Sequence, residues 1–430
     1  MTRIPKRWQR KSLLPCMTMA AVAALSVAAC SSSGSSAASS STATAGASSF
    51  TGSPVKIGII ADVGTVVDWG PEVAAARGAV RQVNANGGIN GHEVVLDFCN
   101  EDLNPNTARD CARQMVSDHV MAMADDGIIT AESDDYKILA AANIANVGPV
   151  SFSGAAGSDP NSYLLRPDEN YSIASLAEYA ISSGDKRIAL ALLDSPLTAT
   201  YKPLLSSVAP ALGGQLVTTV TFPQVTSDVS TQAEALMSAQ PDAVMLQAAP
   251  AAMLPLMKDM DALGYKGKFL SDGAQFTASD LAGLGTVANQ LMFTSPFPPA
   301  TATNILGIKE FRAAMTAEKA AGDAEAPAGD TVESYDIQAW ADVTAIQRIA
   351  NASKATDAAS FKAAINATKD LSLDGVVPPW TPNQSDTAAA EPRVNNGAYY
   401  EYSWVNGTSV LASAKQIDVT SLINKYLPRS

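Results

Sequence analysis

The cysteine, histidine and serine residues of this 430-residue chain limit the reactions it could catalyse. It contains four Cys and two His and has neither a CxxC nor an HExxH motif, so we expect no metal and no cofactor. A Ser-His-Asp triad would need His92, which follows a glycine turn, or His119, at a helix end, and both are typical surface residues. Residues 148–154 lack the G-x-S-x-G spacing, and no Walker A or G-x-G-x-x-G motif follows the first predicted strand. The sequence therefore predicts a protein that is not an enzyme and has no catalytic residue.

The first thirty residues have the composition of an export signal. Five basic residues and no acidic residue lie among the first eleven, and a broken apolar stretch follows over residues 13–29. This stretch is too short for a membrane span, which needs about 20 apolar residues, so residues 1–29 are predicted to be a secretory signal peptide. The motif Val27-Ala28-Ala29-Cys30 resembles the lipobox of bacterial lipoproteins, in which the cysteine becomes the lipidated first residue. A plain signal peptide cleaved near Ala29, with an incidental Cys30, is the alternative.

The acidic balance and the segment after the signal indicate where the mature protein works. The formal net charge is -13, and removal of the five basic residues of the signal lowers it to -18. Nucleic acid is therefore not an expected partner, because phosphate binding needs clustered Lys and Arg. Residues 30–53 consist of Cys30 and almost only Ser, Ala, Gly and Thr, which predicts a flexible tether. We expect an extracytoplasmic protein anchored to the outer face of the cell membrane through its N-terminal lipid alone.

Cys99 and Cys111 are the cysteines that remain once the signal and Cys30 are set apart. They lie where a predicted strand ends and a predicted helix begins, and an exported protein meets an oxidising environment. A bridge between them would close a short loop and contribute about 2–3 kcal/mol by restricting the unfolded chain. We therefore favour a Cys99–Cys111 disulfide over the alternative of two free buried thiols.

Strand and helix patterns alternate from residue 55 onward. Short apolar runs predict strands, and amphipathic stretches opened by residues such as Pro71 or Asn104 predict helices. The predicted strands cover residues 55–60, 93–98, 120–124, 147–152, 187–193, 215–222, 243–247, 268–271 and 399–404, the last being antiparallel with a turn at Asn406-Gly407. The predicted helices cover residues 71–85, 105–117, 133–145, 172–182, 198–212, 230–239, 251–263, 304–321 and 331–350. This alternation and the chain length predict two α/β lobes, each with a doubly wound parallel sheet covered by helices on both faces.

One stretch near the start of the folded part carries a family resemblance. It runs from Gly64-Thr65-Val66-Val67-Asp68-Trp69-Gly70 through Ala76-Arg77-Gly78-Ala79-Val80 to Asn84-Ala85-Asn86-Gly87-Gly88-Ile89-Asn90-Gly91. Together with residues 99–111, this succession resembles the periplasmic binding proteins of the branched-chain amino acid class (type I fold), the substrate-binding receptors of ABC importers. Shorter pieces at 240–244, 263–265 and 334–337 extend the resemblance over most of residues 54–430.

The resemblance implies two lobes joined by three crossing segments, with the ligand in the cleft between the lobes. The crossings would fall near residues 166–170, 295–300 and 376–383. The N-terminal lobe would comprise residues 54–168 with 297–377, and the C-terminal lobe residues 169–296 with 378–430. The resemblance also implies capture of a solute by hinge closure and its delivery to an ABC transporter permease, and we expect a monomer.

The resemblance assigns candidate ligand-binding residues to loops at the carboxyl ends of strands, where open α/β sheets bind ligands. The loop over 153–157 would hold the carboxylate and amine of a ligand with backbone groups and a hydroxyl. Residues 132–134 would supply a hydroxyl and a helix N-terminus, Trp69 would pack on the ligand, and three further residues would face it from the other lobe. The candidates are therefore Trp69, Ser133, Asp134, Ser153, Ala155, Gly157, Tyr201, Gln247 and Asp272.

Departures from the family pattern bear on the ligand. Small Ala and Gly residues replace the threonine that many relatives carry in the loop over 153–157, and Asp134 and Asp135 stand where amino acid binders are rich in Ser and Thr. Four more aspartates, Asp62, Asp68, Asp125 and Asp126, lie near strand ends. Negative loops would repel a lone carboxylate, unless these residues are helix caps or solvated charges. We expect a small polar solute: an amino acid, an amide or an amine.

Two other functions fit the same sequence. A lipoprotein sensor would use the same lobes to report a solute to a membrane kinase or receptor. A structural or adhesive lipoprotein would have a cleft filled by its own side chains. A permease gene beside this one would favour transport, and a kinase gene would favour sensing.

Overall fold

The computed structural model of the protein contains two α/β lobes, each built on its own sheet. It describes residues 50–430 except 66–67, 125–126, 129, 151–153, 196–197, 224–227, 274–275, 277, 328–333, 386–388, 390, 395, 414–415 and 428–430. The predicted fold class, two lobes with parallel sheets covered by helices, is confirmed. The predicted lipidation residue Cys30, the signal, the tether up to residue 49, and Ser153 lie outside the described residues.

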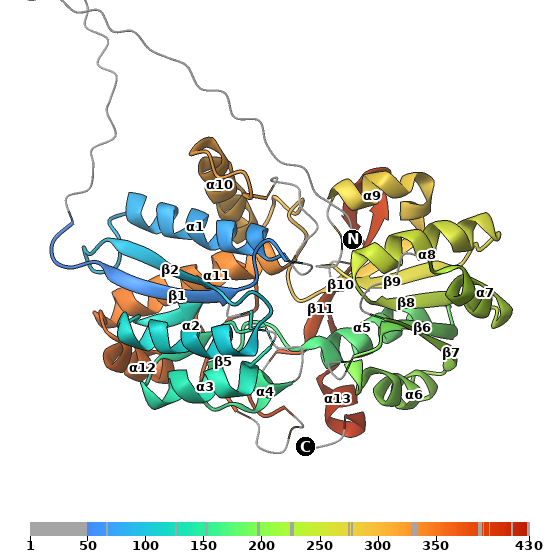
Figure 1. Cartoon of the computed structure of the whole chain (residues 1–430), viewed down its shortest axis with the longest axis horizontal. Coiled ribbons are helices and arrows are strands. Elements are labelled where there is room, and N and C mark those ends of the chain that lie inside the picture. The colour runs from blue at the N-terminus through green and yellow to red at the C-terminus, as the bar shows by residue number, and fades with distance from the viewer. Residues whose placement is uncertain are drawn as a thin grey trace, which may run out of the picture. The chain divides into compact units, whose positions relative to one another are not determined.

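The first lobe has a five-stranded parallel sheet in the order β2-β1-β3-β4-β5. Its first elements are β1 (Val55–Ala61), α1 (Gly70–Ala85), β2 (Val94–Asn100), α2 (Pro105–Ser117), β3 (Ala122–Ala124), α3 (Glu132–Ala141), β4 (Ala145–Val147), α4 (Ala155–Ser158) and β5 (Ser162–Tyr163). Three helices join it from later in the chain: α10 (Leu306–Ala320), α11 (Ser334–Ser353) and α12 (Ala358–Ala367). Helices α1 and α11 cover one face of the sheet, and α2 and α3 cover the other (Figure 1).

Strand β1 shows how the sequence specifies both layers of this lobe. Ile57 and Ile59 belong to the core shared with α1 and α11, whereas Ile60 belongs to the core shared with α2 and α3. Because side chains alternate along a strand, a strand buried on both faces must be apolar at nearly every position. This explains why β1 is a continuous apolar run rather than an alternating one.

The second lobe has an eight-stranded sheet in the order β12-β11-β10-β9-β8-β6-β7, with β13 paired to β11. Its elements are α5 (Glu169–Ser182), β6 (Arg187–Leu193), α6 (Tyr201–Ala211), β7 (Gln215–Phe222), α7 (Ser230–Ser238), β8 (Ala243–Gln247), α8 (Pro250–Ala262), β9 (Lys268–Asp272), α9 (Ala278–Leu284), the 3-10 helix η2 (Gly285–Gln290), β10 (Leu291–Ser295), β11 (Ala398–Val405), β12 (Thr408–Leu411), β13 (Ile417–Asp418) and α13 (Thr420–Tyr426). Strands β6 to β10 are parallel, and the predicted antiparallel strand and its Asn406-Gly407 turn are confirmed as β11 and β12. Helices α5 and α6 cover one face, and α7 and α8 cover the other (Figure 1).

Short elements differ from the predicted ones. The strand predicted over 147–152 is β4, which ends at Val147 because the chain turns at Gly148 with a φ of 65°. Strands β5 and β10 and helices α9, α12 and α13 have no counterpart among the predicted elements. A five-residue apolar run such as β10 fits a helix or a strand equally well until its neighbours β9 and β11 pair with it.

The chain passes between the two cores at three places. It leaves the first sheet after β5 and enters α5, and it returns after β10, since Phe297 already packs in the first core. Trp380 still packs in the first core and its Nε1 donates to the Leu164 carbonyl at 2.9 Å, whereas Val394 packs in the second core. We therefore propose that the third crossing lies between Trp380 and Val394, later than the predicted 376–383.

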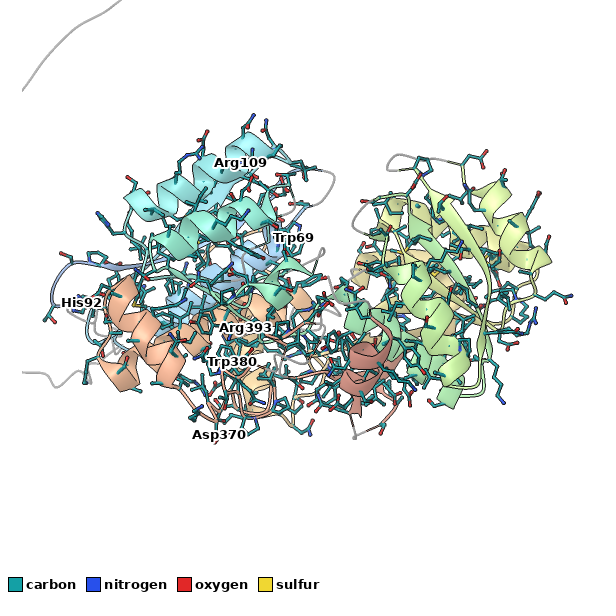
Figure 2. All side chains as sticks on the ribbon, turned by 90° about the horizontal axis from the view of Figure 1, so that it is seen from below. Trp69, His92, Arg109, Asp370, Trp380 and Arg393 are labelled. Carbon is teal, nitrogen blue, oxygen red and sulfur yellow. A yellow bond between two sulfur atoms is a disulfide. The ribbon has the colours of Figure 1, made fainter. Side chains whose placement is uncertain are left out.

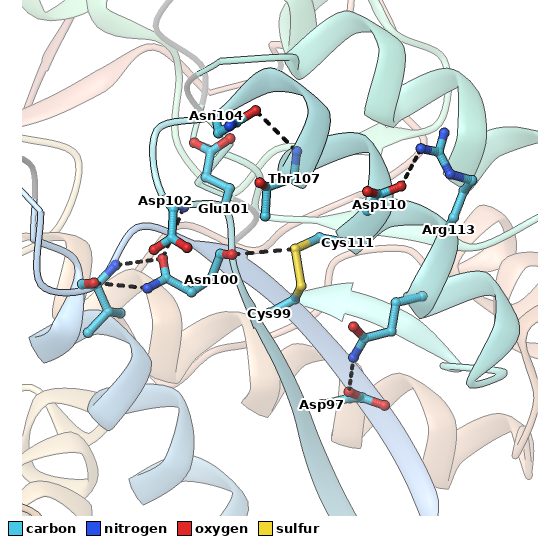
Figure 3. The surroundings of a disulfide bond; sticks show 12 residues. Asp97, Cys99, Asn100, Glu101, Asp102, Asn104, Thr107, Asp110, Cys111 and Arg113 are labelled. Carbon is cyan, nitrogen blue, oxygen red and sulfur yellow. Dashed lines mark hydrogen bonds and ion pairs between the residues drawn. A yellow bond between two sulfur atoms is a disulfide. The ribbon is translucent and has the colours of Figure 1, made fainter.

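The predicted disulfide between Cys99 and Cys111 is present, with the Cα atoms 5.6 Å apart (Figure 3). It joins the end of β2 to the middle of α2, the helix that follows it. The local geometry is set by Asn104, whose side chain caps α2 by accepting the N–H groups of Asn106 and Thr107 at 2.9 and 3.4 Å. The bridge therefore reinforces a strand-to-helix connection that local sequence already specifies.

Two glycines with positive φ give a matched stability test. Gly148 has a φ of 65°, and a Cβ there would lie 2.0 Å from the carboxylate oxygens of Asp342; Gly184 has a φ of 104° with nothing within 4 Å. Both alanine substitutions impose backbone strain of about 1 kcal/mol. We expect Gly148→Ala to lower the free energy of unfolding by about 3 kcal/mol or more and Gly184→Ala by about 1 kcal/mol, measured by urea denaturation. Equal losses would contradict the close approach of Asp342.

Candidate ligand-binding site

Polar side chains gather at the carboxyl edge of the second sheet. Strand β8 ends at Gln247 and the neighbouring strand β9 ends at Asp272, so both residues lie at the edge where open parallel sheets bind ligands. Asp272 is fully buried, and its Oδ2 accepts a hydrogen bond from the Ser172 hydroxyl of α5 at 3.2 Å. Gln247 is 7% exposed, and its Nε2 donates no hydrogen bond to any described residue. The structure therefore brings together two of the residues predicted to bind ligand.

Arg166 connects Asp272 with the first lobe. Its Nη2 lies 2.9 Å from Oε1 of Glu169 and 3.8 Å from Oδ2 of Asp272. Its guanidinium carbon lies 4.4 Å from the centre of the Tyr335 ring in α11, and the Tyr335 hydroxyl donates to Oε1 of Glu169 at 2.9 Å. The Tyr335 ring lies 5.1 Å from the ring of Trp69. A continuous set of side-chain contacts thus joins Trp69 of the first lobe to Asp272 of the second.

Burial shifts the pKa values of the ionisable side chains around Arg166. Burial and then the nearby charge of Asp272 raise the pKa of Glu169, Arg166 opposes them, and the resulting pKa is about 7. Tyr201 begins α6 and is buried. Burial raises the pKa of Tyr201, and the charges of Glu169, Asp168 and Asp272 act in the same direction. The preceding Thr200 donates to Oδ1 of Asn170 at 2.7 Å, which places the start of α6 beside the buried acidic residues.

A second pair of buried carboxyl groups, Asp168 and Glu391, lies against helix α4. The Asn170 side chain donates through Nδ2 to Oδ2 of Asp168 and to Oε1 of Glu391, both at 3.2 Å. A Cβ added to Gly157 would lie 2.9 Å from the Cβ of Glu391, so only glycine allows this approach. Burial, followed by the charge of Asp168, raises the pKa of Glu391 to about 11, and the Glu391 carboxyl is therefore protonated at neutral pH.

The other predicted site residues are placed differently. Ser133 is exposed on α3, and Asp134 beside it forms salt bridges with Arg109 at 2.9 Å and Lys137 at 3.6 Å. The ion pairs of Asp134 are thus with residues of α2 and α3 rather than with the Arg166 group. Ala155 and Gly157 lie in α4, beside the Asp168–Glu391 pair rather than beside Asp272.

The aspartates predicted near the strand ends have different environments. Asp68 caps its own loop, since its Oδ1 accepts two backbone N–H groups at 2.9 and 3.2 Å. Asp62 and Asp135 are fully buried and so are not solvated surface charges. Burial, together with the neighbouring Glu101, raises the pKa of each to about 7. Asp125 and Asp126 lie outside the described residues.

Three residues of the cluster, Arg166, Glu169 and Tyr335, and Glu391 of the neighbouring acid pair were not among the predicted ligand-binding residues. The signal that could have found the first two is the charged run Arg166-Pro167-Asp168-Glu169, which falls at a predicted crossing and is buried in the structure. Tyr335 lies in a piece that carries the family resemblance, but its partner Glu169 is 166 residues away. Glu391 has no local signal, because it stands in a stretch without strand or helix periodicity.

Among the described residues, no group of three or more His, Cys, Asp or Glu side chains is arranged to hold a metal ion. His92 is engaged through Nδ1 with the Ser53 carbonyl at 2.8 Å and lies on the outer side of the first lobe, away from Trp69 (Figure 2). In the described part of the chain, no helix combines the length and the apolar character that a membrane crossing requires.

The sequence profile described as periplasmic binding protein matches residues 54–405. The chain belongs to the periplasmic binding protein family, whose members are extracytoplasmic, bind small solutes and are not enzymes. No curated protein matches the chain in sequence.

Solved structures share the two-lobed type I fold. A fatty acid ABC transporter substrate-binding protein from Thermomonospora curvata matches with a TM-score of 0.71 at 16% identity, covering 88% of this chain and 96% of its own. An ABC transporter solute binding protein from R. palustris in complex with 4-hydroxybenzoate gives 0.69 at 17%, covering 85% and 97%. The branched-chain amino acid transporter substrate binding protein LivJ from Streptococcus pneumoniae in complex with isoleucine gives 0.66 at 17%, covering 85% and 99%. At these identities the likeness establishes the fold, and the predicted family resemblance is confirmed.

The protonated carboxyl of Glu391 predicts how stability depends on pH. A carboxyl whose pKa is raised by folding stabilises the protein fully only below its unfolded pKa, and this contribution falls as pH rises toward the folded pKa of about 11. Glu391→Gln mimics the protonated form and cannot ionise. Between pH 6 and 9, we expect the free energy of unfolding of the wild type to fall more steeply than that of Glu391→Gln, by about 1.4 kcal/mol per pH unit.

Urea denaturation across this pH range measures the difference in slope. Glu234→Gln makes the same replacement of a carboxyl by an amide at an exposed position on α7, and it should keep the wild-type pH dependence. Parallel curves for the wild type and Glu391→Gln would show that Glu391 is ionised in the folded protein and would contradict the buried acid pair.

Proposed function

We propose that the protein is an extracytoplasmic solute-binding lipoprotein that captures a small amine-bearing solute between its lobes and delivers it to an ABC importer. Membership of the periplasmic binding protein family supports solute binding outside the cytoplasm. The solved structures with the same fold include ABC transporter substrate-binding proteins, which supports the importer as partner. Because those structures are named for different ligands, the ligand class has to be argued from the side chains of this chain.

The observation that carries the ligand class is the excess of buried carboxylate at the sheet edge. Asp272 and Glu169 share one guanidinium, that of Arg166, so the three groups together hold a net charge of -1 when both carboxyls are ionised. Arg166 lies over the Tyr335 ring at 4.4 Å, and the Trp69 ring lies 5.1 Å from the Tyr335 ring; aromatic faces attract cations. A protonated amine satisfies both features, whereas a ligand carrying only a carboxylate would meet repulsion.

Gln247 adds a requirement for an acceptor on the solute. Its Nε2 is buried without a hydrogen-bond partner among the described residues, and leaving a buried donor unsatisfied costs about 1–3 kcal/mol. A carbonyl or carboxylate oxygen of a ligand at the end of β8 would remove this penalty. An amino acid or an amino amide carries both the amine for Asp272 and the oxygen for Gln247.

Capture by hinge closure follows from where these residues stand. Trp69 and Tyr335 belong to the first lobe, Gln247, Asp272 and Tyr201 to the second, and Arg166 lies in the first crossing. A solute held by both groups would favour the closed arrangement of the lobes, because closure buries it between them. A closed, loaded form would present a composite surface to the permease.

A thermal-shift screen tests the ligand class. The purified protein is scanned against amino acids, their amides and the corresponding amines, with fatty acids and 4-hydroxybenzoate as amine-free comparisons. A solute that binds the native state at 100 times its Kd adds about 2.7 kcal/mol of stability, and we expect only amine-bearing compounds to raise the Tm. Asp272→Asn should weaken such binding by about tenfold or more, because it removes the carboxylate that pairs with the amine.

Asp261→Asn is the matched control, since Asp261 pairs with Lys266 on the surface of the same lobe at 3.2 Å. It should leave binding unchanged. Stabilisation by the amine-free acids alone, or by no compound of the panel, would contradict an amine-bearing ligand.

The proposed anchor has a separate test. In the organism that makes the protein, Cys30→Ser should remove the thiol that carries the lipid, because a serine hydroxyl does not form the thioether of a lipoprotein. We expect the wild type in the detergent-rich phase of a Triton X-114 partition and the variant in the aqueous phase. Partition of both into the aqueous phase would favour a plain cleaved signal peptide. Cys16→Ser, within the predicted signal, is the control and should not change the partition.

A further inference from the structure

One guanidinium serves two buried carboxylates at the proposed site. Arg166 is 3% exposed, Glu169 is 4% exposed and Asp272 is fully buried. The guanidinium of Arg166 lies closer to one carboxylate than to the other: Nη2 is 2.9 Å from Glu169 but 3.8 Å from Asp272. Nη1 has no hydrogen-bond partner among the described residues. Asp272 is therefore the carboxylate that Arg166 holds less tightly.

We propose that Arg166 determines which ligand charge the site accepts, by acting as an internal counter-ion for Glu169 and Asp272. This inference rests on the proposed function and concerns the selectivity of the same site. Arg166 acts through the two carboxylates and is a positioning residue. It limits the negative charge offered to a ligand, so that the site takes one positive charge and does not take two.

The contacts explain why an arginine suits this role. Its planar guanidinium stacks on the Tyr335 ring at 4.4 Å while donating to Glu169, and the Tyr335 hydroxyl donates to the same Glu169 oxygen at 2.9 Å. Arg166 is therefore held in place by Tyr335 and Glu169 without relying on Asp272. A ligand amine can then approach Asp272 while the pair of Arg166 and Glu169 stays intact.

The magnitude of the effect follows from distance and charge. Removing a unit charge about 4 Å away changes the interaction with a charged ligand by more than about tenfold at an effective dielectric constant of about 20, before other groups respond. The response here is protonation of Glu169, whose ionisable neighbours are Asp272, Arg166, Tyr335 and Asp168. Without Arg166, burial and these acidic neighbours favour the neutral form of Glu169, which cancels part of the added negative charge.

The test compares two probes that differ only in the amine. L-leucinamide carries a protonated amine at pH 7, and 4-methylpentanamide has the same carbon chain and amide without the amine. The measured quantity is the ratio of their affinities in calorimetric titrations of the full protein. We expect Arg166→Gln to raise the preference for L-leucinamide roughly tenfold, because the competing cation is gone. Arg166→Lys should keep the wild-type ratio, because it restores the charge.

Two further variants complete the design. Glu169→Gln removes one carboxylate and leaves Arg166, so it should lower the preference for L-leucinamide; it also tests the inference if Arg166→Gln does not fold. Arg113→Gln removes an exposed positive charge on α2, paired with Asp110, and should leave the ratio unchanged.

The outcomes separate this inference from the proposed function. Equal changes for both probes in Arg166→Gln, or an unchanged ratio in Glu169→Gln, would show a purely structural role for Arg166 and overturn the inference alone. If the wild type bound neither probe, this would contradict the amine-bearing ligand class. The inference that Arg166 selects ligand charge would then be contradicted as well.

Discussion

The burial of ionised side chains where the chain passes between its two cores constrains the rest of this structure. Arg166, Asp168, Glu169, Asp272 and Glu391 are each less than 5% exposed, and they come from three separate parts of the chain. An unpaired charge in such a place costs several kcal/mol, so each must have a partner or lose its charge. Arg166 pairs with Glu169 and Asp272, and the carboxyl of Glu391 keeps its proton beside Asp168. These pairings require the first crossing, the edge of the second sheet and residue 391 to lie together.

The same constraint connects the fold to the proposed function. Parallel strands bring Gln247 and Asp272 to one edge of the second sheet, and helix α11 brings Tyr335 to the same cluster. The ring of Trp69, from the first lobe, packs against Tyr335. The same fold occurs in solved proteins named for very different ligands, so the fold alone does not choose a solute. The choice of solute depends on the charged and hydrogen-bonding groups of the cluster around Arg166. In this chain, carboxylates and aromatic rings dominate that cluster.

The elements that could be predicted are those with strong local signals. Strands β6 and β7 and helix α2 have the predicted bounds, because the two strands are apolar or β-branched runs of seven and eight residues and α2 has an Asn104-Pro105 start. Strand β10, with five residues, and β5, with two, carry too little periodicity to be recognised, and pairing with neighbours defines them. The later position proposed for the third crossing rests on a contact of the same kind: Trp380 gives no local sign of its contact with Leu164, which is 216 residues away.

Residue patterns along the chain were enough to predict the two-lobed α/β class, the family and the Cys99–Cys111 bridge, since all three depend on periodicity, short motifs or residues close in the chain. They also pointed to Trp69, Gln247 and Asp272. Three-dimensional packing was needed to show that Asn170 contacts Glu391 across 221 residues, that Tyr335 contacts Glu169 across 166, and that Arg166 lies between two carboxylates. The physical reason is that the charge state of a buried group depends on desolvation and on partners brought by other elements, and neither can be read from the residues beside it.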